Sequence, residues 1–130
     1  APQLPRLRLL WVTPLRSLAV DTVRALREAL QGLQLNWTVA MRTGDASARD
    51  KRLARTGKAE VVVITPESLA LQLSYADAEQ VFARVSAVIV DEWHELLGSD
   101  RAIYALFLIL ALHRKLLSAV RMYRLISISL

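Results

Sequence analysis

The sequence predicts an α/β protein in which a parallel sheet carries helices on both faces. Apolar runs rich in branched residues, typical of buried strands, alternate about five times with segments whose apolar residues recur at helical spacing. Short turns join them, as in a doubly wound sheet. The 130 residues, 54% hydrophobic and 22% charged, fit one globular domain.

The expected elements follow in order along the chain. Strands are expected at 7–13, 36–42, 61–64, 87–90 and 122–127, and helices at 16–33, 46–55, from 66 onward and 100–118. Asp45 or Ser47 is expected to begin the second helix, and Thr65 to cap the third. The strands of such a sheet run parallel, so their carboxyl ends meet at one edge, where open α/β sheets bind ligands.

Charge and composition limit the classes of partner. The net charge is +5 and the pI is about 10.2, and a basic domain attracts polyanions such as nucleic acid, although a solvated surface without a ligand explains the same charge. The absence of cysteine excludes disulfides, thiolate metal sites and a cysteine nucleophile, and is compatible with the cytoplasm. The apolar run 102–112 is shorter than the roughly 20 residues that cross a bilayer, so a buried helix and no membrane partner are expected. The alternative is a segment on a membrane surface, since basic residues follow the run.

The sharpest motif is an apolar strand that ends in two adjacent acids, Asp91 and Glu92, followed by His94. Phosphoryl transfer from ATP needs Mg²⁺ near the phosphates and a group that orients or deprotonates the attacking water. Asp91 suits the first task, through a metal-bound water, and Glu92 suits the second. The competing interpretation is that both acids merely favour the first turn of a helix through its dipole. Spacing alone assigns His94 no role.

Three turns are expected at the same edge as Asp91. Two of them follow the order strand, Thr-Pro, helix, and their sequences are Thr13-Pro14-Leu15-Arg16 and Thr65-Pro66-Glu67-Ser68; the third is Thr43-Gly44-Asp45. Free amides at the start of a helix bind phosphate, and Gly44 allows a backbone to approach closely. Several such turns along one edge suit a nucleic-acid backbone better than a small ligand. Ordinary helix capping explains each Thr-Pro by itself.

Positive charge is concentrated between Arg42 and Lys58. This run fits either a track for phosphates or the solvated face of a helix. Within it, Thr56-Gly57-Lys58-Ala59 looks like part of a phosphate-binding loop. That loop needs a Gly five positions before its second Gly and a Ser or Thr after the Lys, where this sequence has Arg52 and Ala59. The segment is therefore not a phosphate-binding loop, and no other Gly-Lys occurs in the chain.

Taken in order, the motifs LLWVTPLRSLA, RTGD, VVVITPESL and VIVDEWHELLGS resemble those of the DExH-box helicases of superfamily 2. The resemblance covers about residues 7 to 101 and is closest to the large helicase-related type, especially the bacterial ligase-associated DEXH-box helicases. It implies a RecA-like fold, hydrolysis of ATP with Mg²⁺, translocation along single-stranded DNA with separation of duplex DNA, and a role in DNA repair. It also implies a second RecA-like domain and DNA ligase or other repair proteins as partners.

The resemblance gives each motif a role. Asp91 would hold Mg²⁺, Glu92 would activate water, and His94 would help couple the nucleotide site to DNA. The turns at 13–16, 43–45 and 65–68 would contact DNA. Ser127 and Ser129 lie where the family carries Ser-Ala-Thr, which links hydrolysis to unwinding, and here Ile128 replaces the small central residue.

The sequence also departs from the family pattern. It lacks the upstream adenine-reading and phosphate-loop motifs and the second RecA-like domain with its arginine finger, so residues 1–130 are expected to form part of the first RecA-like domain, with the N-terminal phosphate-loop unit missing from its sheet. The stretch 102–123 is unusually apolar, which fits either a decayed end or a helix that needs a missing partner. The alternative function is a catalytically inactive nucleic-acid-binding or degenerate fragment.

Overall fold

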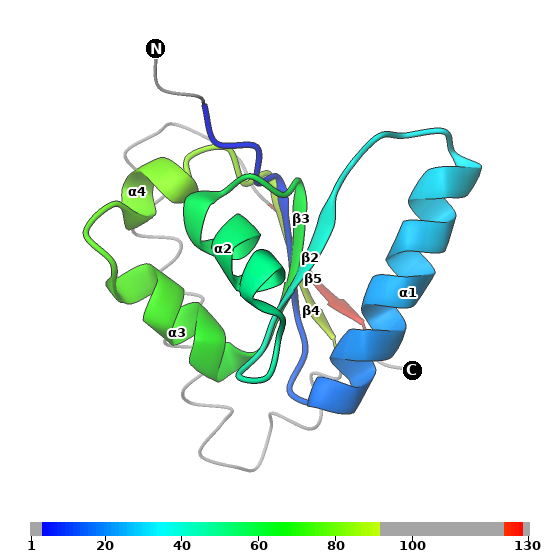
Figure 1. Ribbon diagram of the computed structural model, residues 1–130, viewed down its shortest axis with the longest axis horizontal. Coiled ribbons are helices and arrows are strands. Elements are labelled where there is room, and N and C mark those ends of the chain that lie inside the picture. The colour runs from blue at the N-terminus through cyan, green and yellow to red at the C-terminus, as the bar shows by residue number, and fades with distance from the viewer. Residues whose placement is uncertain (1–3, 92–123, 129–130) are drawn as a thin grey trace.

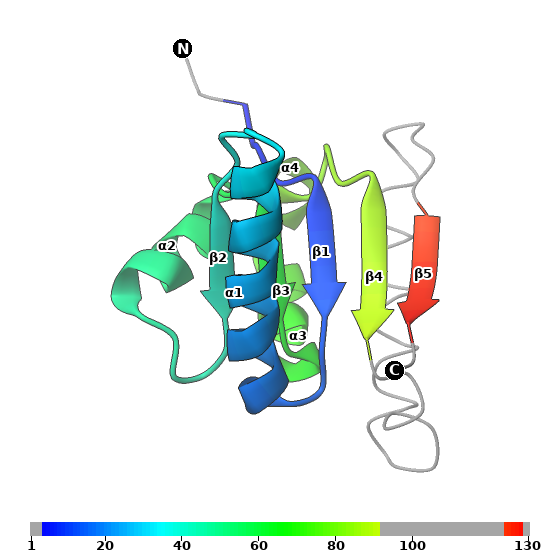
Figure 2. The same cartoon turned by 90° about the vertical axis from the view of Figure 1, so that its right-hand side faces the viewer.

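The computed structural model describes residues 4–91 and 124–128. Their strands form one parallel sheet in the order β2-β3-β1-β4-β5, and Figure 2 shows the arrows pointing the same way. The strands are β1 (Leu9–Val12), β2 (Val39–Arg42), β3 (Val61–Ile64), β4 (Ala87–Asp91) and β5 (Arg124–Ile128). The predicted parallel sheet is confirmed.

Helices cover both faces of this sheet, as predicted (Figure 1). Helix α1 (Arg16–Gly32) lies on one face, and α2 (Ala48–Thr56), α3 (Pro66–Ser74) and α4 (Ala78–Val81) lie on the other. Within the part of the chain that the structure describes, no helix has the length and apolar character needed to cross a bilayer.

Strand β3 anchors both layers of the core. All four of its residues are at most 1% exposed. Val62 and Ile64 belong to the apolar cluster under α2, α3 and α4, whereas Val61 and Val63 pack with Ala19 and Val23 of α1. Fully burying such a side chain contributes about 1.5 to 3 kcal/mol, so this run of branched residues stabilises the sheet from both sides.

The element boundaries differ from the prediction in ways that side chains explain. Strand β2 begins at Val39 rather than at residue 36, and Trp37 before it is 40% exposed instead of packed. Helix α2 begins after Ser47, whose Oγ accepts a hydrogen bond from the Asp50 amide at 3.1 Å, so Ser47 and not Asp45 is its cap. The four-residue helix α4 was not expected. The helix expected at 100–118 lies outside the described residues.

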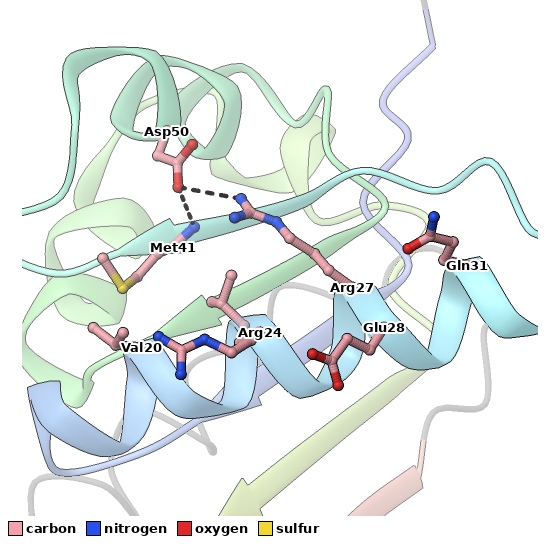
Figure 3. Close-up of a pocket in the computed structure, with 8 residues that line it drawn as sticks. Val20, Arg24, Arg27, Glu28, Gln31, Met41 and Asp50 are labelled. Carbon is pink, nitrogen blue, oxygen red and sulfur yellow. Dashed lines mark hydrogen bonds and ion pairs between the residues drawn. The ribbon is translucent and has the colours of Figure 1, made fainter.

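Strand β2 is an edge strand, and two side chains bind backbone groups on its outer side. Figure 3 shows Asp50 between the Met41 amide and Arg27. Arg27 Nη2 donates a 2.8 Å hydrogen bond to the Val39 carbonyl, and Asp50 Oδ2 accepts one of 2.9 Å from the Met41 amide. Arg27 Nη2 and Asp50 Oδ2 lie 4.0 Å apart. An uncovered edge strand would offer these groups to another chain, so the pair protects the edge while joining α1 and α2 to it.

We expect Asp50→Ala to lower the free energy of unfolding by about 1 to 3 kcal/mol, because the Met41 amide loses its acceptor. Urea unfolding followed by circular dichroism measures the change. The matched control is Asp21→Ala, which removes an exposed carboxylate of α1 and should change the free energy by less than about 0.5 kcal/mol. Equal losses in the two variants would contradict the role given to Asp50.

Candidate functional site

The carboxyl ends of the strands carry a row of buried polar side chains. Val12 pairs with Ile64 and with Val90, and Arg42 pairs with Ile64. The residues that follow these positions therefore line up across the edge, in the order Thr43, Thr65, Thr13 and Asp91, and each is at most 5% exposed. The predicted turns and the predicted acid Asp91 thus lie at one edge of the sheet.

Asp91 lies on the α1 side of the sheet. Val88 and Val90 face the cluster under α3, so the alternation of side chains along β4 turns Asp91 toward α1. Trp11 Nε1 donates a long hydrogen bond of 3.5 Å to Asp91 Oδ2. Both residues line a mostly apolar pocket of about 450 Å³ along the flank of α1. Glu92 and His94 lie outside the described residues.

The two Thr-Pro turns differ in what their threonines do. Thr13 is not a helix cap, because α1 begins after Leu15. The Thr13 hydroxyl is buried and has no hydrogen-bond partner among the residues that the structure describes. Thr65 does occupy the cap position of α3, as predicted, with Pro66 after it, but its hydroxyl bonds Ser68 Oγ at 3.1 Å rather than a helix amide. Simple capping therefore does not account for either threonine.

The third turn is held together by its own side chains. Thr43 Oγ1 donates a 2.7 Å hydrogen bond to Asp45 Oδ1, and the Ala46 amide donates to the Thr43 carbonyl at 3.2 Å. The hydrogen bond from Thr43 lowers the pKa of Asp45, and the nearby charges of Arg16 and Lys51 act in the same direction. Arg16 Nε lies 4.0 Å from Asp45 Oδ1, which links this turn to the start of α1.

A pocket of about 510 Å³ lies among the three turns. The predicted residues that line it are Pro14, Arg16, Gly44, Thr65, Glu67 and Ser68. Two further cations, Arg42 and Lys51, line the same pocket. The sequence had placed both only in a general basic run. The sequence did carry a signal that both cations lie near the turn at 43–45, since Arg42 ends the strand before that turn and Lys51 lies in the first turns of the helix after it.

The rest of the basic run does not line this pocket. Arg55 Nη1 lies 2.9 Å from Asp77 Oδ1, and its guanidinium carbon lies 3.9 Å from the centre of the Tyr75 ring, so it joins α2 to the segment before α4. Arg52 and Lys58 are exposed. Gly57 ends α2 with a φ of 68°, a left-handed conformation that glycine adopts easily. The Gly57-Lys58 pair is therefore a helix end, in agreement with its rejection as a phosphate loop.

Strand β5 brings Ser127 to the same edge. Ser127 pairs with Val90, one residue before Asp91 in β4. Ser129 lies outside the described residues. No group of three or more potential metal ligands occurs among residues 4–91 and 124–128.

The sheet order, the helices on both faces and the acid at the carboxyl edge define a RecA-like α/β domain. The structure of Mycobacterium smegmatis helicase Lhr bound to ssDNA and AMP-PNP matches with a TM-score of 0.77 and 29% sequence identity, over 95% of this chain and 17% of that chain. The crystal structure of the DUF1998 helicase MrfA matches with a TM-score of 0.81 over 95% of this chain and 20% of that chain. Its 22% identity supports the shared fold alone.

The family model for DEAD/DEAH box helicases matches residues 2–122, and the chain belongs to this family. The Lhr helicase/uracil glycosylase of Escherichia coli K12 is 32% identical over 104 residues, which are 72% of this chain and 7% of the relative. The ATP-dependent helicase Lhr-Core of Methanocaldococcus jannaschii is 35% identical over 101 residues, which are 70% of this chain and 12% of the relative. The chain thus spans a small part of their length. The resemblance to superfamily 2 helicases is confirmed, and the ligase-associated subtype stays a prediction.

We expect Thr43→Val to raise the pKa of Asp45 toward its ordinary value, because the hydrogen bond to the carboxylate is the largest cause of the lowering. The carboxyl-carbon resonance of Asp45, followed by NMR as the pH falls, measures the midpoint. A group with a lowered pKa stabilises the fold above its unfolded pKa, and this contribution is lost as the pH falls through the folded pKa. Thr43→Ser keeps the hydroxyl and should keep the lowered pKa; an unchanged midpoint in Thr43→Val would contradict the assignment.

Proposed function

We propose that this chain is part of the first RecA-like domain of an ATP-dependent DNA helicase, which couples ATP hydrolysis to movement along single-stranded DNA and to strand separation. The observation that carries the proposal is the position of Asp91 at the same sheet edge as the turns at 13–16, 43–45 and 65–68. Rigid secondary elements can transmit a change between two sites. A single sheet that carries both the nucleotide site at Asp91 and the DNA-contacting turns would therefore link ATP hydrolysis to movement along DNA.

On the nucleotide side, Asp91 would hold Mg²⁺ through a metal-bound water. Mg²⁺ keeps several waters and binds through one or two carboxylates together with the phosphates of the substrate, so a single buried carboxylate at a strand tip fits it. Bound Mg²⁺ neutralises charge on the phosphates of ATP. Glu92 orients and deprotonates the attacking water, and His94 couples this site to DNA. Ser127, beside Val90 in the sheet, and Ser129 link hydrolysis to unwinding.

On the nucleic-acid side, the three turns contact the phosphate backbone. The pocket among them contains helix-start residues from α3 and the cationic side chain of Arg16. The similar helicase from Mycobacterium smegmatis was solved with ssDNA and AMP-PNP, which supports DNA as the polymer and ATP as the nucleotide. A second RecA-like domain supplies the arginine finger. The parent helicase acts in DNA repair in the cytoplasm, with DNA ligase or other repair proteins as partners.

The alternative is a binding module without catalysis. Two observations favour it: these 130 residues contain no phosphate-binding loop, and the cationic pocket shares no lining residue with the pocket beside Asp91. Nucleic-acid binding in this form would not depend on Asp91 or Glu92. The two functions therefore separate in their response to substitutions at Asp91 and Glu92.

We expect the purified 130-residue chain to hydrolyse ATP barely, if at all. The physical reason is that the chain contains neither a loop to hold the triphosphate nor an arginine finger, and the finger alone supplies about 10³ to 10⁵ in rate. Release of inorganic phosphate from Mg-ATP, with and without single-stranded DNA, measures the activity. Robust turnover that disappears in Glu92→Gln would overturn this expectation and assign full catalysis to the chain itself.

We expect the chain to bind single-stranded DNA with an affinity that falls as salt rises, and Arg16→Ala to weaken this binding because a phosphate contact is lost. Fluorescence anisotropy of a labelled oligothymidylate, at about 50 to 200 mM NaCl, measures the dissociation constant. In the binding-only alternative, Asp91→Asn leaves the constant unchanged. Binding that does not respond to salt would count against phosphate contacts altogether.

A further inference from the structure

Arg42 and Lys51 are tied to the same turn from two elements. Arg42, at the end of β2, donates from Nη1 to the Thr43 carbonyl at 3.2 Å. Lys51, in α2, donates from Nζ to the Gly44 carbonyl at 3.0 Å. Both residues are half-buried. Each bond uses one of several donors that a guanidinium or an ammonium carries, so both cations keep donors for a ligand.

These two cations differ from Arg16 in how firmly they are placed. The side chain of Arg16 is 66% exposed, and its partner Asp45, at 4.0 Å, is 65% exposed. An exposed ion pair of this kind holds a side chain weakly. A Cβ on Gly44 would lie 3.1 Å from Arg16 Nη2, so the guanidinium lies directly over the turn. Arg16 can leave Asp45 for a stronger anion, whereas Arg42 and Lys51 are already oriented.

The pocket that all three cations line has the charge and the room for a phosphate group. Arg16, Arg42 and Lys51 face a single lining carboxylate, Glu67, so positive charge prevails. The start of α3 also lines the pocket, through Thr65 and Ser68, and the amide end of a helix favours an anion. A volume of about 510 Å³ accommodates a phosphate with its adjoining sugar atoms.

We propose that Arg42 and Lys51 form a fixed seat for one backbone phosphate of the nucleic-acid strand, over which Arg16 closes when it exchanges Asp45 for that phosphate. The inference rests on the proposed function and names the residues that hold the strand. The seat takes a phosphate of the polymer rather than of ATP, because it shares no lining residue with the pocket beside Asp91.

The test compares Arg42→Gln, Lys51→Gln and Arg52→Gln in the full chain. Arg52 is the matched control: it adjoins Lys51 in α2, carries the same charge and is exposed, and it does not line the pocket. The probe is a fluorescent oligothymidylate, and its dissociation constant is measured by anisotropy at several NaCl concentrations. An oligonucleotide of the same length with abasic sugars keeps the phosphates and removes the bases, and unlabelled ATP serves as competitor.

We expect Arg42→Gln and Lys51→Gln each to weaken binding. Each should also make the negative slope of the logarithm of the association constant against the logarithm of the salt concentration shallower by about one, whereas Arg52→Gln should change this slope by much less. The abasic probe should respond in the same way, and ATP should not displace either probe. A merely structural role would weaken binding without a change in slope. Circular dichroism spectra and urea midpoints of the variants identify any loss of folding.

Each outcome separates the inference from the proposed function. If the unsubstituted chain binds no oligonucleotide, the nucleic-acid function itself fails. If it binds with a normal salt slope but the three substitutions have equal effects, the seat is wrong and the function stands. Loss of binding to the oligothymidylate alone, with the abasic probe unaffected, would assign Arg42 and Lys51 to the bases and overturn the phosphate seat. Displacement by ATP would place the nucleotide there instead.

Discussion

The pairing of β1 with β3 on one side and with β4 on the other is the constraint on which the site depends. It aligns Val12 with Ile64 and with Val90, so the residues that leave these strands meet in one row. A shift of one residue in a strand would turn each side chain to the opposite face. The same register therefore decides both that Asp91 reaches the edge and that it shares the α1 side with Trp11.

The sheet also separates two kinds of chemistry. On the α1 side, Asp91 borders a mostly apolar pocket, and apolar surroundings strengthen the attraction between a carboxylate and a cation. Among the turns, Arg16, Arg42 and Lys51 border a second, more polar pocket. The buried hydroxyl of Thr13 lies in the row between Thr65 and Asp91. A displacement of β1 or its turn would affect both pockets.

Side chains from two elements, β2 and α2, and from the turn itself hold the turn at 43–45 in place. Arg42 and Lys51 bind two of its carbonyls, and Thr43 binds Asp45. Asp50, next to Lys51, binds the backbone of β2 at Met41. The first turns of α2 thus fix the sheet edge and the neighbouring loop together. Groups oriented before binding lose little conformational freedom when a ligand arrives.

The sequence by itself determined the alternation of strands and helices, the bounds of β3 and the acid at the end of β4. It also named Ser47 as one of two candidate caps of α2. These features depend on local periodicity and chain stiffness. The tertiary structure alone decided the strand order, and hence that Arg42 and Lys51 face Arg16 while Arg55 turns to Asp77. It also decided that Thr13 caps no helix and that Asp50 covers the sheet edge. The contacts of Arg16 and Arg55 join residues far apart in the chain, and the local sequence does not encode which strands become neighbours.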